Sequence, residues 1–547
     1  MKKFFTSMIL AMAALTISAK EYSGQLMVVV NGMASPGPAN INIDRQDNDR
    51  YTISLRNFML TMAGTEVPVG NITLTDIEGQ KQGTDVVTFD VEQTIAIEEG
   101  DLDGVAMWLG PMIGDVPIKL HATLEREQRL SVDIDIYLDM LKQTVKVFFD
   151  NAATQIPNSD FELFHKESMK TGLIFTTTVT EDEADHWHSF LSGTGSLITI
   201  AATKHTEIST DIRPGSKGSK SLLVKAGNVM GVVANGTITT GQLNAGDMTA
   251  ASTKNCAFAD MSKTDRDANG DPFYTELQAL PDSLVVWVKF NQKKALAEHP
   301  YATVSAAITD GTYYQDPEDK DYTNVVARAA NRQIRSTNQW QRLSIPFEYT
   351  GNDVDPRCII VTLSTNADAG QGTDGDELYV DDLELVYNHK LTALKIQGKD
   401  VSGFDSNVLE YNAEVSGSLV DEDGNIVADA IQTETDARGA VVSCALVGSD
   451  DEQQLLVTVV SADLTQGTTY TVNLTTTTGI RTMHNASSSL ISHPSSVYDL
   501  QGRKVEMLNV EKLNKQMGQN RSSFQPFNFS TLKRGIYIVN GKKVVIK

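Results

Sequence analysis

Cysteine is scarce in this chain of 547 residues, which contains only Cys256, Cys358 and Cys444. An odd number of widely spaced cysteines excludes a framework of disulfide bonds. No group of histidines accompanies them, so they do not form the ligand pattern of a cysteine-based zinc site. We expect all three to be buried as small hydrophobic side chains.

Long apolar runs are missing beyond the N-terminus, where no stretch approaches the length of a membrane-spanning helix. The one apolar run, residues 4–17, follows two lysines and precedes the small residues Ser18 and Ala19. This pattern is typical of a secretory signal peptide, which we place at residues 1–19. No cysteine stands at the cleavage site to carry a lipid anchor. We therefore expect an exported protein without an integral membrane segment, located at the cell surface, outside the cell or in the periplasm.

Positive charge is also in short supply. The chain has 46 Lys and Arg residues against 70 Asp and Glu residues, a net charge of −24. Residues 501–547 hold ten basic and two acidic residues, which leaves 36 basic against 68 acidic residues in the rest. Because phosphate backbones are bound by basic patches, this acidic body excludes nucleic acid as a partner.

Catalytic motifs are absent as well. The sequence has no Gly-x-Ser-x-Gly elbow, no phosphate-binding loop and no His-Glu-x-x-His helix. Glycoside hydrolysis needs two carboxyl groups, one with a raised pKa, and among 70 acidic residues no pair stands out. We therefore name no catalytic residue and expect a non-catalytic protein.

Alternating apolar and polar residues dominate the remaining sequence. Every second residue of 130–136 is Leu, Val or Ile, so these side chains share one face of a half-buried strand. Residues 51–55 and 86–91 alternate in the same way, and turn pairs such as Asn-Gly separate the runs. Long amphipathic helices are scarce. The sequence predicts an all-β protein of several domains.

Residues 20–150 contain enough short strand segments, about eight to ten, to close a barrel. The opening segment 22–30 and the paired strands around 120–149 resemble the calycin-like, lipocalin-like barrel domains of exported Bacteroidetes proteins. Small barrels are often filled by side chains, and we expect a filled core here. The alternative is a barrel that holds a small apolar molecule.

Residues 154–388 are bracketed by two segments with carboxylates at strand ends, 158–162 and 379–385. Three further segments lie between them, at 214–224, 280–290 and 340–347. Their order resembles a Bacteroidetes domain family provisionally assigned to carbohydrate metabolism and, more distantly, jelly-roll carbohydrate-binding modules. The resemblance implies a jelly-roll β-sandwich in which these two segments are the opening and closing strands.

The C-terminal part divides into three segments. Residues 389–476 contain short strands separated by turns and predict an immunoglobulin-like β-sandwich. Residues 477–496, rich in Thr and Ser, are expected to be a linker. Residues 497–547 resemble the sorting segments of the type IX secretion pathway, which implies attachment to the outer surface. Residues 506–531 separate the two halves of this segment more widely than is usual in that family.

A structural calcium ion is expected in the central domain, because jelly-roll modules often bind Ca²⁺ between their first and last strands. Residues 366–384 hold seven acidic residues and no basic one. Within the bracket we select Asp160, Glu162 and Asp382 as ligands. The alternative is a solvated acidic loop beside an edge strand.

Carbohydrate binding requires exposed aromatic rings with polar partners for the hydroxyl groups. Trp287 and Trp340 lie in strand-like segments and are expected to be structural. The polar surroundings of four other aromatic residues make them candidate carbohydrate contacts: Trp187, Tyr313, Tyr314 and Tyr322. His186 and His188 flank Trp187, but no third ligand is evident, so we assign them no transition metal.

These observations favour an exported, non-catalytic protein that binds glycan through its central domain. Two alternatives stay open. One is a carbohydrate-active enzyme of the glycoside hydrolase kind, and the other is a structural or adhesive surface protein without a sugar ligand.

Overall fold

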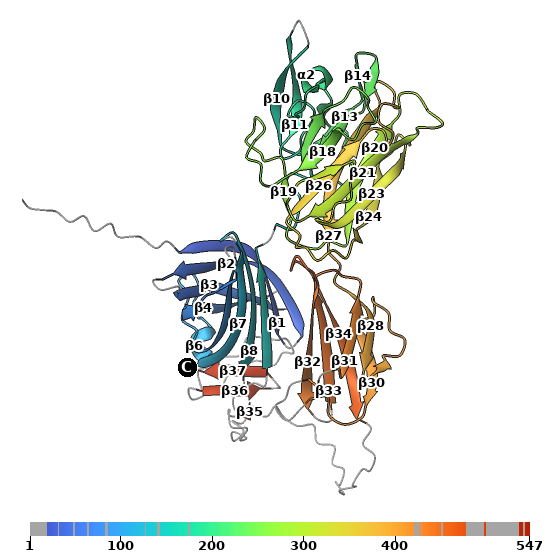
Figure 1. The fold of residues 1–547 in the computed structure, drawn as a ribbon. Helices are drawn as coiled ribbons and strands as arrows, with labels where there is room; N and C mark the ends of the chain where they lie inside the picture. The colour runs from blue at the N-terminus through green and yellow to red at the C-terminus, as the bar shows by residue number, and fades with distance from the viewer. Residues whose placement is uncertain are drawn as a thin grey trace, which may run out of the picture.

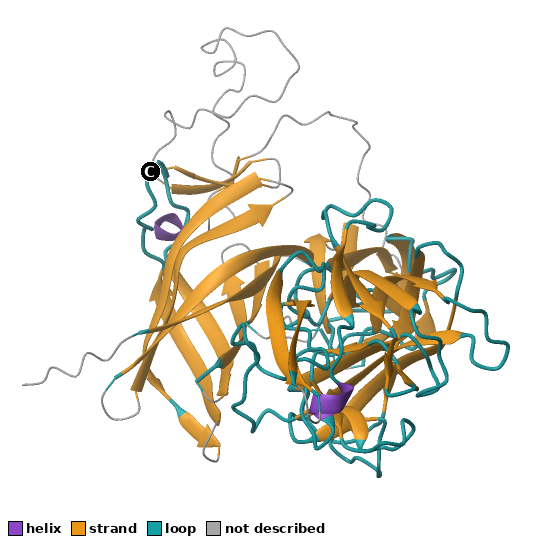
Figure 2. Ribbon diagram, turned by 90° about the horizontal axis from the view of Figure 1, so that it is seen from above, coloured by secondary structure: helices purple, strands orange, loops and turns teal. Residues whose placement is uncertain are grey.

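The computed structural model describes residues 19–476, with short gaps at 31, 47–49, 63–64, 83–85, 126, 139–142, 152, 173–175, 421–425, 428 and 450–451, together with 497–498, 535–539 and 542–546. The predicted signal peptide (apart from Ala19), the predicted linker and most of the sorting-like segment lie outside these residues. Strands dominate the described part, which confirms the all-β prediction (Figures 1 and 2). The two helices described, α1 (Gly110–Ile113) and α2 (Ile198–Ala201), are single turns, and no helix in this part is long and apolar enough to span a membrane.

The N-terminal sheet has nine strands in the order β4-β3-β2-β1-β9-β8-β7-β6-β5. Its strands are β1 Lys20–Val30, β2 Met33–Arg45, β3 Arg50–Met62, β4 Thr65–Glu78, β5 Gln80–Gln82, β6 Val86–Ala96, β7 Asp115–Glu125, β8 Arg129–Leu138 and β9 Gln143–Asp150. A bridge between Asn71 and Glu98 and a hydrogen bond from Gln93 to the Thr75 carbonyl join its two ends. The sheet therefore curls into a nearly closed barrel, as the sequence predicted.

Alternation along β1 explains the packing of the barrel. Leu26 and Val28 point into an apolar interior that side chains from all the long strands share. Met27 and Val29 point outward and pack against Val460 of the C-terminal sandwich. The uninterrupted apolar run of β1 thus reflects burial on both faces.

The central part is a sandwich of two sheets. The first sheet has the order β12 Thr206–Ser209, β13 Ser221–Lys225, β27 Glu377–Val386, β20 Ser283–Asn291 and β24 Gln341–Pro346. The second has the order β16 Thr237–Thr239, β26 Cys358–Ser364, β21 Tyr301–Thr309, β23 Val325–Arg335 and β25 Glu348–Tyr349, with β19 Thr275–Glu276 paired to β26. Smaller elements cover the sandwich: the hairpin β10 Phe164–Thr171 and β11 Thr177–Ala184, the hairpin β14 Gly227–Val229 and β15 Val232–Ala234, and the small sheet β17 Gln242–Ala245, β18 Asn255–Ala259 and β22 Tyr314–Asp316.

One hydrophobic core fills the space between the two central sheets. The first and last residues of the central sandwich lie next to each other. Gln155 exchanges two hydrogen bonds with the backbone of Leu385, and the Tyr387 hydroxyl donates to the Thr154 carbonyl. Residues about 230 apart therefore lie side by side. Cys256 and Cys358 are buried as expected, whereas Cys444 is only partly buried.

The C-terminal sandwich packs a three-stranded sheet on a four-stranded one (Figure 1). Its strands are β28 Leu391–Ile396, β29 Lys399–Asp400 and β31 Ile431–Thr435 in the first sheet, and β30 Glu410–Val415, β34 Gly467–Thr476, β33 Glu452–Val460 and β32 Val441–Ser449 in the second. Near the C-terminus β35 Val497–Tyr498, β36 Gly535–Val539 and β37 Lys542–Ile546 form a further small sheet.

Candidate functional site

The outer face of the first central sheet carries an unusual mixture of aromatic and charged side chains. Along β20, Val286, Val288 and Phe290 point into the core. Trp287 and Lys289 alternate with them and therefore point to the opposite face. Trp287 is partly exposed there, although it stands in an apolar strand.

Neighbouring strands extend this face in cross-strand rows. Trp287 lies opposite Asp381 of β27, and Lys289 lies opposite Tyr379. Trp340, which directly precedes β24, places its ring 6.5 Å from that of Tyr379 at an angle of 71°. Three aromatic rings that are distant in sequence thus share one side of the sheet.

Lys289 and Asp211 connect the rings by polar contacts. The Lys289 ammonium lies 4.1 Å from the centre of the Tyr379 ring and 5.7 Å from that of Trp340. It also pairs with the Asp211 carboxylate, which accepts a hydrogen bond of 3.1 Å from Trp340 Nε1. Partial burial acts to raise the pKa of Asp211, but the hydrogen bonds from Lys289 and Trp340 outweigh it and hold the pKa below its usual value.

Asp381 is the buried acid of this face. Its side chain is 0 % exposed, its Oδ2 accepts the backbone N–H of Arg213 at 2.9 Å, and its Oδ1 has no partner. Burial, with a smaller contribution from the neighbouring Asp382 charge, raises its pKa to about 6. The Arg213 guanidinium lies over the Trp287 ring at 5.4 Å and pairs with Asp382. The face therefore combines flat apolar rings with fixed donors and acceptors.

A separate cavity of about 300 Å³ lies on the outer face of the second sheet. Its lining includes Thr303, Ser305 and Thr362 of the second sheet together with apolar residues such as Val232 and Met248. This lining suits an amphipathic small molecule, and it holds only one aromatic ring, that of Phe190.

Three of the four aromatic residues chosen from the sequence are not exposed. Trp187 is 0 % exposed and packs at 5.1 Å against Phe161 in the central core. Tyr314 and Tyr322 are buried against each other, with ring centres 5.1 Å apart. The expected exposure of these three residues is wrong, because their rings fill core space beneath the polar loops that carry them. Tyr313 is 39 % exposed, and its role as a carbohydrate contact stays a prediction.

Trp287 and Trp340 were missed because a strand-like segment suggested burial. The sequence did contain a signal: in residues 284–290, Trp287 and Lys289 occupy the positions that alternate with the core residues. A lysine on one face of a strand indicates that the tryptophan two residues away also faces outward.

The expected calcium ligands have separate surroundings. Glu162 accepts two hydrogen bonds from the backbone N–H groups of Ser219 and Lys220, both at 2.7 Å. Asp382 pairs with Arg213, and Asp160 is exposed. The three carboxylates are not among the groups of described residues whose ligand atoms share one point. Calcium binding by them stays a prediction.

Comparison with known proteins supports the barrel. Residues 19–152 match the family of the calycin-like beta-barrel domain, which confirms the resemblance expected for residues 20–150. No curated protein matches the sequence. The family resemblances of the central and C-terminal segments stay predictions.

Solved structures from three Bacteroides species show partial likenesses. A protein of Bacteroides vulgatus, provisionally described as a glycoside hydrolase, is 20% identical, with 43% of this chain and 97% of that chain covered and a TM-score of 0.27. A Bacteroides thetaiotaomicron protein with the same provisional description is 15% identical, with 47% and 86% covered and a TM-score of 0.28. A provisionally described outer membrane protein of Bacteroides fragilis is 14% identical, with 24% and 49% covered and a TM-score of 0.19. At these TM-scores the likenesses carry no functional argument.

Proposed function

We propose that this protein is an exported, non-catalytic carbohydrate-binding protein whose binding surface is the outer face of the first central sheet. The observation that supports this proposal is the array of Trp287, Trp340 and Tyr379 around the Lys289–Asp211 pair. The signal-peptide pattern and the acidic body of the chain agree with a role outside the cytoplasm.

The chemistry of this face matches that of a sugar ring. A pyranose presents a flat patch of C–H groups, which packs on aromatic faces, and a rim of hydroxyl groups, which exchange hydrogen bonds with charged and amide groups. Asp211 has both its oxygens engaged by Lys289 and Trp340, so its position is fixed before a ligand arrives. Such preorganisation lowers the entropic cost of binding.

The acidic residues of this face support carbohydrate binding better than they support hydrolysis. Asp381 has the raised pKa that a general acid requires, but its carboxyl group is fully buried. A proton donor must come within hydrogen-bond reach of the glycosidic oxygen. Asp381 would meet this requirement only if Arg213 and its loop moved away.

A glycan array probed with the full-length protein tests the proposal. We expect binding to at least one class of plant, host or microbial glycan, and at least about tenfold weaker binding for Trp340→Ala and Tyr379→Ala, since an aromatic contact contributes about 1–2 kcal/mol. Tyr301→Ala is the matched control, because this tyrosine also lies beside a cation, Arg335, but on the second sheet.

Two further arms locate the site. Tyr313→Ala tests the loop chosen from the sequence, and Val232→Trp fills the cavity on the second sheet. Absence of binding to every glycan would overturn the function. Binding that is lost only in the loop or cavity variant would keep the function and overturn the surface.

A further inference from the structure

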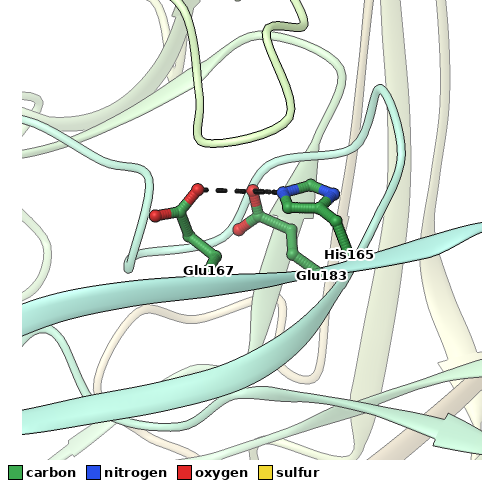
Figure 3. A group of neighbouring side chains, drawn as sticks. All are labelled: His165, Glu167 and Glu183. Atoms are coloured by element: carbon green, nitrogen blue, oxygen red, sulfur yellow. Dashed lines mark ion pairs between the residues drawn. The ribbon is translucent and has the colours of Figure 1, made fainter.

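Side chains from three segments of the central sandwich meet at one buried point next to the hairpin β10–β11. His165 on β10 lies opposite Glu183 on β11. His188 follows four residues after β11, and Asp267 comes from a loop about 80 residues further along the chain. Figure 3 shows His165, Glu183 and the neighbouring Glu167 with their polar ends directed toward one another.

Four atoms at this point are buried and have no hydrogen-bond partner: His165 Nε2, Glu183 Oε1, His188 Nδ1 and Asp267 Oδ2. The side chains of Glu183, His188 and Asp267 are 0 % exposed, and that of His165 is 11 % exposed. Unsatisfied buried polar atoms are rare and costly in native proteins. Four of them facing one another indicate that a ligand satisfies them together.

The distances between these atoms match a coordination shell. His165 Nε2 lies 3.9 Å from Glu183 Oε1 and 3.6 Å from Asp267 Oδ2. His188 Nδ1 lies 3.6 Å and 3.5 Å from the same two oxygens. A tetrahedral ion with bonds of about 2.1 Å separates its ligands by about 3.4 Å, so these four separations exceed that spacing by half an ångström at most.

Three of the four residues also form one of the groups of described side chains that could hold a metal ion. The ligand atoms of Glu183, His188 and Asp267 all lie within 4.8 Å of one another. Two imidazoles and two carboxylates supply four ligands of the types that zinc accepts, and zinc with four protein ligands is tetrahedral.

The other polar atoms of the four residues are held in place. Asp185 Oδ1 lies 3.0 Å from His165 Nδ1, and the Pro272 carbonyl lies 3.2 Å from His188 Nε2. The outer nitrogen of each imidazole thus has an acceptor for its N–H, which leaves the inner nitrogen free to offer its lone pair to a metal ion at the shared point.

The carboxylates are anchored in the same way. Glu183 Oε2 accepts hydrogen bonds from the Ser189 backbone at 2.7 Å and from the Ser192 hydroxyl at 3.0 Å. Asp267 Oδ1 accepts the Asp271 backbone N–H at 2.8 Å. The carboxylates of Glu167, Glu183, Asp185 and Asp267 all lie within 4 Å of a ring nitrogen of His165, and a divalent cation would compensate this concentration of acidic groups in a buried place.

We propose that His165, Glu183, His188 and Asp267 bind one divalent transition-metal ion of the zinc class. Two imidazole nitrogens favour such an ion over calcium, which takes oxygen ligands. Four protein ligands complete a tetrahedron and leave no open position, so the ion is structural. It ties the hairpin and the Asp267 loop to the core, independently of any carbohydrate bound on the sheet face.

Metal content of the full-length protein tests this proposal. After removal of metals with a chelator, addition of ZnCl₂ and gel filtration, elemental analysis should find one zinc per chain. Cobalt in place of zinc should give the visible absorption of a tetrahedral site. The melting temperature of the wild type should fall on chelation and recover with zinc but not with calcium.

Matched variants locate the ligands. Asp267→Asn and His188→Gln should weaken zinc binding more than about tenfold, the lower end of what even indirect partners of a metal contribute. Asp265→Asn in the same loop and His186→Gln beside His188 should bind zinc as the wild type does. Absence of stoichiometric zinc and cobalt in the wild type would overturn the proposal, as would recovery by calcium alone or equal binding in Asp267→Asn. Because the chelation and cobalt experiments use the wild type, they decide the matter even if a variant fails to fold.

Discussion

Replacing Asp381 by Asn removes a charge from the most deeply buried position of the candidate binding face. The pKa of Asp381 is raised from an ordinary 3.8 to about 6, chiefly by burial. Below about pH 3 the carboxyl group is protonated in both the folded and the unfolded chain and does not affect their balance. As the pH rises from 3.8 to about 6, the unfolded chain releases this proton while the folded chain retains it, so the folded state loses stability, and above pH 6 the loss stays constant.

The size of this loss follows from the pKa difference. A gap of roughly two pKa units at 1.36 kcal/mol each amounts to about 3 kcal/mol in total, most of it lost between pH 4 and pH 6. Asn has nearly the shape of the protonated acid and can still accept the Arg213 N–H. The variant should therefore lie within about 1 kcal/mol of the wild type at pH 4 and be about 3 kcal/mol more stable than it at pH 7.

Urea unfolding followed by tryptophan fluorescence measures this difference, because Trp187, Trp287 and Trp340 all lie in the central sandwich and Trp108 alone lies in the barrel. Asp382→Asn is the control, because it makes the same charge change at the neighbouring residue, whose side chain is 27% exposed. It should change the free energy of unfolding by less than about 1 kcal/mol. A stability difference between Asp381→Asn and wild type that is the same at pH 4 and pH 7 would refute the burial argument.

Three further changes test other parts of the fold. Trp187→Ala should destabilise the central sandwich by about 3–5 kcal/mol in urea unfolding, whereas a ligand contact would lower affinity and leave stability intact. Gly32→Ala should loosen the contact between the barrel and the C-terminal sandwich, because φ is +76° and a Cβ would lie 2.3 Å from the Leu456 side chain. The looser contact should be detected as faster proteolysis of the segments that join the domains, and unchanged proteolysis would contradict that contact. If Asp160, Glu162 and Asp382 bind calcium, Ca²⁺ added to the zinc-loaded protein should raise its melting temperature further, and Asp160→Asn should abolish this additional rise; a rise that persists in this variant would exclude these ligands.

Local sequence patterns were sufficient to predict the architecture, whereas long-range packing determines which aromatic residues are exposed. Period-two alternation depends on a strand alone, so the barrel and the all-β class were predictable. The exposure of Trp187 depends on which residues lie above it: its polar neighbours suggested a surface loop, but the loop folds its ring onto Phe161. For Trp287 the local signal existed, and the error was to treat an apolar strand as buried on both faces.

Local sequence patterns could not have predicted the proposed metal site. Residues 265–276 read Asp-x-Asp-x-Asn-Gly followed, after five residues, by Glu, which is the spacing of a calcium-binding EF-hand loop. In the structure Glu276 lies in strand β19 and is exposed, Asp265 is exposed, and the flanking helices of that motif are missing from this described region. The tight turn at Gly270 serves another purpose, since the Asp267–Asp271 hydrogen bonds close it and direct Asp267 toward His165 and His188. A motif search would therefore predict calcium from one segment, whereas the histidines that favour zinc come from two segments about 80–100 residues earlier. Only the fold reveals which ion the loop serves, and the opposite responses expected to zinc and to calcium make that choice measurable.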